Sequence, residues 1–125
     1  MKRAEMKRGK SPRLSEYERE FEAMKPFVRA RSKGICEGMV LALVYGAEPE
    51  DVLEAFPAGA CQLNATEVHH RKYRQRGGTN ALSNLAHLCK RCHDFAHAQG
   101  GFGKLANRLG LSLSTGQSED LEFYA

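Results

Sequence analysis

The four cysteines of this 125-residue chain constrain its fold more than any other feature. Cys89 and Cys92 form a C-x-x-C pair, which places two sulfurs on one side of a tight turn, as tetrahedral zinc requires. Cys36 and Cys61 complete a single four-cysteine site if all four are used. Buried unpaired thiols are the alternative, and disulfides are the least favoured option because no export signal is readable. The 24 residues between Cys36 and Cys61 predict an insertion within the first zinc knuckle.

Charge is distributed in blocks along the chain. Residues 1–34 carry eleven basic and five acidic side chains, residues 35–68 carry six acids and no Lys or Arg, residues 69–108 carry eight basic side chains and one acid, and the rest adds three acids, for a net charge of +4. Two basic segments around an acidic one indicate a polyanionic partner, because contacts with a phosphate backbone release counterions. Without an apolar run long enough to span a membrane, the chain is expected to be soluble and cytosolic, with no membrane partner.

The N-terminal third predicts helices. Leu14, Tyr17, Phe21 and Met24 recur at helical spacing, and Ser15 followed by Glu18 has the form of a capping box. A helix is therefore expected over residues 16–25. Pro26 is expected to stop or kink this helix and to begin a short second one over 26–32, which Gly34 closes.

The rest of the chain predicts short elements joined by polar loops. The apolar run 39–45 is ambiguous between strand and helix. Further expected elements are a short helix over 49–56, strands over 66–70 and 84–88, a helix over 89–99 that Gly100-Gly101 ends, and a last short helix over 103–111. The expected organisation is a flexible basic arm at 1–13, one domain at 14–111 with an acidic and apolar insert at 38–60, and a flexible tail at 112–125.

The 38–60 insert carries most of the acidic block of the chain. It is expected to face away from the basic loop 71–76, because a polyanion would repel it. Its apolar side chains are expected to pack on the domain itself, with a homodimer as the alternative.

Four of the five histidines fall in two clusters. His93 and His97 are four residues apart, so on a helix both rings project from one face and can bind one cation. His69 and His70 are adjacent on a predicted strand, where neighbouring side chains point to opposite faces. One of them can bind the cation while the other reaches the reacting centre only if the strand end is twisted. The fifth, His87, has no evident partner and is expected to be structural.

An ordered set of motifs carries a family resemblance. It consists of Thr66-Glu67-Val68-His69-His70, Gly77-Gly78, Asn84-Leu85 and Leu88-Cys89-Lys90-Arg91-Cys92-His93, with His97 beyond. In this combination the chain resembles the HNH endonuclease family in its four-cysteine form, as often found in bacteriophages. The resemblance implies an α+β fold with N-terminal helices, in which a small ββα-metal (His-Me) finger surrounds one cation and a structural zinc braces it.

The resemblance also implies roles for individual residues. The three letters of the family name fall on His70, Asn84 and His93, which are the expected catalytic residues. The expected ligands of the catalytic cation, whose identity among Mg, Mn, Ni and Zn stays open, are His69, His93 and His97. The expected ligands of the structural zinc are Cys36, Cys61, Cys89 and Cys92.

These roles predict a metal-dependent endonuclease for double-stranded DNA. Histidine titrates near physiological pH, so His70 can take the proton of an attacking water, while the cation stabilises charge on the phosphate. Asn84 would orient His70 or its strand, and the expected phosphate contacts are Arg71, Lys72, Arg74 and Arg76. The alternatives are a zinc-stabilised DNA-binding module without catalysis and an RNA-directed nuclease. The expected location is the cytoplasm, that of the host if a bacteriophage encodes the chain.

Overall fold

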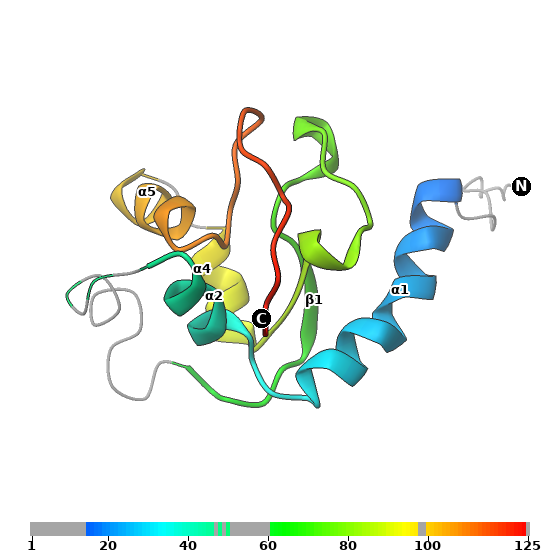
Figure 1. Cartoon of the computed structure of the whole chain (residues 1–125), viewed down its shortest axis with the longest axis horizontal. Helices are drawn as coiled ribbons and strands as arrows, with labels where there is room; N and C mark the ends of the chain where they lie inside the picture. The colour runs from blue at the N-terminus through cyan, green and yellow to red at the C-terminus, as the bar shows by residue number, and fades with distance from the viewer. Residues whose placement is uncertain (1–14, 47, 49, 51–60, 98–99, 125) are drawn as a thin grey trace, which may run out of the picture.

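A β-hairpin followed by a helix lies at the centre of the computed structural model, with helices on both sides (Figure 1). The structure describes residues 15–46, 48, 50, 61–97 and 100–124. The elements in chain order are helices α1 (Glu16–Ser32) and α2 (Gly38–Val44), strand β1 (Glu67–His70), the 3-10 turns η1 (Arg74–Arg76) and η2 (Leu82–Asn84), strand β2 (Leu85–Leu88), and helices α4 (Lys90–Ala96) and α5 (Gly100–Arg108). The predicted α+β fold with N-terminal helices is confirmed, and it is consistent with a ββα-metal finger.

The two strands pair antiparallel, with Glu67 opposite Leu88 and His70 opposite Leu85. All four residues of β2 are buried, because α1 and α2 both pack against this strand. β1 is buried mainly at His69. The strands predicted over 66–70 and 84–88 are confirmed, each within one residue of its observed bounds.

Helix α1 begins at the predicted capping box. The Ser15 hydroxyl accepts the Glu18 N–H, and the Glu18 carboxylate accepts the Ser15 N–H. The prediction that Pro26 separates two helices is wrong, because α1 runs through Pro26 to Ser32. The lost backbone hydrogen bond lies on an exposed face, while the buried Val28 and Ser32 hold the second half of the helix on the domain.

Helix α2 resolves the ambiguous apolar run as a helix. Leu41 and Ala42 enter the core, whereas Leu43 and Val44 stay exposed. This part of the insert therefore packs on its own domain, as expected. The helix predicted over 49–56 and the arm predicted over 1–13 lie outside the described residues, apart from residue 50.

Helices α4 and α5 differ in their bounds from the sequence prediction. The predicted helix 89–99 ends at Ala96, and a new helix begins at Gly100, where a stop was expected. Leu105, Ala106 and Leu109 of α5 are buried in the core. This burial outweighs the low helix propensity of glycine.

Residues 111–124, which we name the C-terminal strap, differ most from expectation, because residues 112–125 were predicted to form a flexible tail. The strap crosses the domain between α4 and the hairpin (Figure 1). Leu111, Leu113 and Phe123 are buried, and the Tyr124 hydroxyl donates to the Glu37 carboxylate. These contacts are long-range, so the local polarity of the segment did not reveal them. No described helix is long and apolar enough to cross a membrane.

Candidate metal centres and active site

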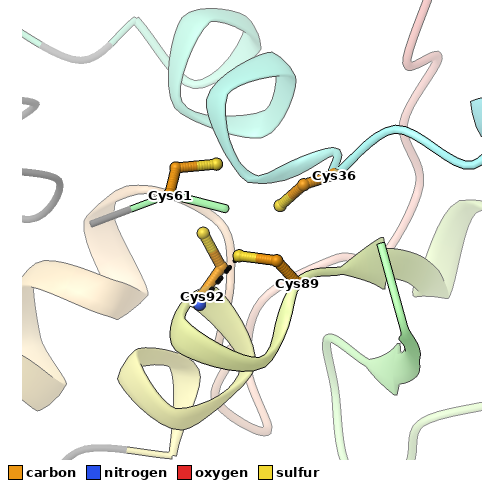
Figure 2. A group of neighbouring side chains, drawn as sticks. All are labelled: Cys36, Cys61, Cys89 and Cys92. Atoms are coloured by element: carbon orange, nitrogen blue, oxygen red, sulfur yellow. Dashed lines mark hydrogen bonds between the residues drawn. The ribbon is translucent and has the colours of Figure 1, made fainter. Parts of the chain in front are cut away.

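The four cysteines meet in one cluster. Their Sγ atoms all lie within 4.8 Å of one another, and Figure 2 shows the four sulfurs pointing toward a common centre. Cys36 precedes α2, Cys89 caps the N-terminus of α4 and Cys92 lies in its first turn. Cys61 comes from the segment before β1, so the long sequence gap after Cys36 does not prevent the two from meeting.

Backbone groups around the cluster are arranged for thiolate ligands. The N–H groups of Gly38, Gln62 and Cys92 point at cysteine sulfurs over 3.4–3.5 Å. A Cβ at Gly38 would lie 3.1 Å from the Cys92 sulfur and 3.6 Å from the Cys36 sulfur. Glycine at this position leaves the centre of the cluster open for an ion.

The protonation of the thiols favours a cation as well. A hydrogen bond from Cys92 lowers the pKa of the Cys36 thiol to about 5, and the same contact raises the pKa of Cys92. Burial raises the pKa of Cys61. A cation at the centre would stabilise further thiolates, which would otherwise repel one another at this distance. The four residues therefore fit a structural metal site, and sulfur-only tetrahedral ligation is typical of zinc.

The second cluster joins His69 from β1 with His93 from α4 and His97 at the end of that helix. One ring nitrogen from each lies within 4.8 Å of the others. The Nε2 atoms of His93 and His97 face each other at 3.1 Å. The Nε2 atom of His69 lies 2.7 Å from the Leu111 carbonyl oxygen, which can only accept, so Nε2 carries the proton and the lone pair is on Nδ1. Three lone pairs in this arrangement fit one divalent cation and leave coordination positions open.

Burial keeps two histidines of this cluster in the neutral form that binds cations. His69 is almost fully buried, and this burial lowers its pKa to about 3. Burial, followed by the neighbouring His97, also lowers the pKa of His93. Both residues are therefore neutral at physiological pH.

His70 projects from the other face of β1. Its ring stacks on Tyr17 and lies against Phe21, both from α1. Within the part of the chain that the structure describes, His69, His93 and His97 contact one another and Tyr73, and His70 is not among their ring contacts. The alternation of side chains along the strand separates the two neighbouring histidines, as expected for an untwisted strand.

Asn80, which the sequence did not single out as a site residue, holds the His70 ring. Its Oδ1 lies 2.8 Å from the His70 Nε2, and its Nδ2 donates to the Tyr17 carbonyl at 2.9 Å. Since Oδ1 can then only accept, Nε2 of His70 carries the proton and Nδ1 has the lone pair. Asn80 is buried within a predicted polar loop, where the sequence offered no signal of its partner.

Asn84 braces the loop after β1. Its side chain accepts the Lys72 N–H at 2.8 Å and donates to the carbonyls of Lys72 and Thr79. These contacts fix the backbone at Lys72, two residues beyond His70. The Asn84 side chain therefore holds the loop that follows β1, and its bonds to Lys72 and Thr79 do not involve the His70 ring.

The four basic residues predicted to contact phosphates fall into two groups. Arg71 is fully buried, and its guanidinium donates to the carbonyls of Ser83, Gly110 and Glu119 and to the Tyr45 hydroxyl. The expectation that Arg71 contacts nucleic acid is corrected, because its donors already bind the domain. Lys72 is half-buried and donates to the Gln117 carbonyl, whereas Arg74 and Arg76 are exposed.

His87 is buried, with its Nδ1 2.6 Å from the Ser32 hydroxyl. Burial lowers its pKa. It lies in β2 and takes no part in the cluster of His69, His93 and His97. This position agrees with the structural role expected for it.

Comparison with known proteins gives one match. Residues 58–99 match a family model described as HNH endonuclease. The matched segment includes the hairpin, three of the cysteines and the histidine cluster, whereas Cys36, α1 and the C-terminal strap lie outside it. No curated protein and no solved structure matches the chain.

Proposed function

We propose that the chain is a metal-dependent DNA endonuclease. The premise is that it carries a domain of the HNH endonuclease family, whose members are phosphodiester hydrolases. The cluster of His69, His93 and His97 is the observation that carries the proposal. Nucleic-acid binding alone does not require three histidine rings around one point, so the cluster argues against a purely DNA-binding module.

The histidine cluster would hold the catalytic cation. When bound, the cation stabilises negative charge on the phosphate and on the departing oxygen. The chain contributes the fixed orientation of the rings, through the Leu111 carbonyl at His69 and the helical spacing of His93 and His97. The cysteine cluster would hold zinc, far from any role in the reaction, and would fix α4 on the hairpin.

His70 would act as the general base. Its Nδ1 has the lone pair, because Asn80 occupies Nε2. His70 is the last residue of β1 and faces away from His69. The water activated by His70 and the phosphate bound at the cation would therefore meet around the end of the strand. Asn84 supports this geometry by fixing the loop that leaves the strand.

Double-stranded DNA is the proposed substrate. Arg74 and Arg76 are exposed at η1 and follow β1 directly, so they can bind phosphates next to the strand end. Lys90 and Arg91, at the start of α4, are exposed as well. Such contacts give sequence-independent affinity that falls as the salt concentration rises.

Nicking of a supercoiled plasmid tests the proposal. The protein is incubated with Mg²⁺, Mn²⁺, Ni²⁺ or Zn²⁺, with and without EDTA, and an RNA of the same sequence is the parallel substrate. We expect cation-dependent cleavage of DNA that EDTA stops. In the His70→Ala variant, cleavage should fall roughly a hundred- to ten-thousandfold while folding and metal content are retained.

A matched control is Gln75→Ala, which truncates an exposed side chain in η1. This variant should nick DNA at the parent rate. Cleavage by His70→Ala within a few-fold of the parent would show that His70 is not the base. Cleavage of the RNA alone would contradict the proposed substrate.

A further inference from the structure

Tyr73 contacts the histidine cluster from the basic loop. Its hydroxyl lies 2.7 Å from the Nδ1 of His97, and its ring stacks on the His97 ring with centroids 5.5 Å apart and an interplanar angle of 19°. The same ring lies nearly perpendicular to that of His69, with the two centroids 6.2 Å apart. Tyr73 therefore touches two of the three residues that would hold the cation.

The hydrogen bond lies on the outer nitrogen of His97. The inner nitrogen, Nε2, faces His93 and is the one that can bind the cation. A histidine that binds a cation through Nε2 carries its proton on Nδ1, and it then donates this proton to the Tyr73 oxygen. The contact accommodates the tautomer of His97 that offers Nε2 to the cation, and it fixes the rotation of the ring.

The backbone of Tyr73 is held firmly enough for this role. Its carbonyl accepts the N–H groups of both Arg76 and Gly78 at 2.9 Å. A Cβ at Gly78 would lie 1.8 Å from the Lys72 carbonyl oxygen, so only glycine allows this close turn. The Arg76 guanidinium lies over the Tyr73 ring at 4.9 Å from its centroid.

We propose that Tyr73 is a positioning residue for the catalytic cation, which it serves by orienting His97 through the hydroxyl. The inference rests on the proposed function only in taking the histidine cluster as the cation site. Partners of this kind, behind a metal-binding histidine, typically contribute a factor of roughly 10 to 100 in metal affinity.

Cobalt titration of the full chain tests the role without any cleavage assay. The protein is purified with zinc in the cysteine cluster, and Co²⁺ binding to the histidines is followed by its visible absorption. The sulfur-to-cobalt charge-transfer band, which reports exchange at the cysteines, is monitored at the same time. Tyr73→Phe keeps the stacked ring and removes only the hydroxyl, and we expect it to weaken cobalt binding roughly 10- to 100-fold.

Two further variants make the result specific. Tyr124→Phe removes a hydroxyl bond to Glu37 at the C-terminal strap and should bind cobalt like the parent. His97→Ala should abolish the visible absorption at the same cobalt concentrations. Zinc content and thermal unfolding of Tyr73→Phe should match those of Tyr124→Phe, which separates a loss of metal affinity from a loss of fold.

The possible outcomes distinguish this proposal from the nuclease proposal. Equal cobalt affinity in Tyr73→Phe and the parent would overturn the role of Tyr73, whether or not the parent cleaves DNA. No cobalt binding by the histidines of the parent would overturn it too. Weakened cobalt binding in Tyr73→Phe supports it even if the parent fails to cleave DNA, in which case only the nuclease proposal falls.

Discussion

The Nε2 atom of His69 lies 2.7 Å from the carbonyl oxygen of Leu111, 42 residues further along the chain. This contact joins β1 to the start of the C-terminal strap. It turns the lone pair of His69 toward His93 and His97, so a backbone group outside the matched family segment orients one of the three candidate ligands. The strap is therefore part of the support of the histidine cluster.

Burial of His69 predicts a loss of stability in mild acid. Its folded-state pKa is lowered to about 3, below the unfolded value of 6.5, so the unfolded chain binds the proton first as the pH falls. The free energy of unfolding should be highest above pH 6.5 and should decrease by about 2 kcal/mol between pH 6.5 and pH 5 from this group. A bound cation would add to this loss of unfolding free energy at low pH, because it too binds only neutral histidine.

Urea unfolding at several pH values checks this effect. His69→Gln removes the titrating group, and its free energy of unfolding should depend less on pH in this window than that of the parent. The lowered pKa values of His93 and His87 leave a residual dependence of the same sign. Identical pH profiles for His69→Gln and the parent would contradict the prediction.

Replacement of a cysteine should unfold the region around the cluster. Cys89→Ser removes a ligand that also accepts the N–H groups of Gln62 and Cys92. Structural zinc contributes on the order of 10 kcal/mol in small domains, so the variant should lose zinc and cooperative unfolding together. Elemental analysis and circular dichroism measure both. A parent protein that purifies folded without bound metal would refute the structural zinc.

Arg71 and Arg74 should respond differently to the same substitution. Arg71→Gln leaves several buried carbonyls without their donor and should cost on the order of 3 kcal/mol in unfolding free energy. Arg74→Gln should lower the unfolding free energy by about 1 kcal/mol at most, because the exposed side chain loses only its contact over the Tyr17 ring. The Arg74→Gln variant should instead show a shallower decrease of log DNA affinity with log salt concentration, its slope being smaller in magnitude by about 1. Filter binding at four salt concentrations gives the slope, and an unchanged slope would remove Arg74 from the DNA contacts.

Asn80 should affect the rate of cleavage more than the binding of DNA. Asn80→Ala removes the acceptor that fixes the His70 ring, and kcat should fall about tenfold, the equivalent of one hydrogen bond, with little change in KM. Thr79→Ala is the matched control, because it alters the neighbouring loop residue and its contact with Glu119. A drop of equal size in Thr79→Ala would indicate that the loop as a whole, rather than the contact with His70, sets the rate.

Local sequence rules determined a large part of this protein. The capping box at Ser15 and Glu18, the two strands and the pair Cys89 and Cys92 were all predicted, since each depends on residues a few positions apart. The spacing of His93 and His97 likewise sufficed to place two rings together. Helix continuity at Pro26 was predicted wrongly, because packing of the second half of α1 overrides a local propensity.

Only the tertiary structure decided which side chains meet across long separations. Arg71 enters the core because the strap and η2 supply carbonyl acceptors for its guanidinium. Arg74, three residues further on, has the same side chain and stays exposed. His70 lies under α1 with Asn80, and Tyr73 lies against His97, through contacts that no sequence period encodes. The sequence alone determined which groups can bind a metal, because that follows from their chemistry and local spacing. Their orientation depends on hydrogen bonds from distant segments, and those exist only once the chain has folded.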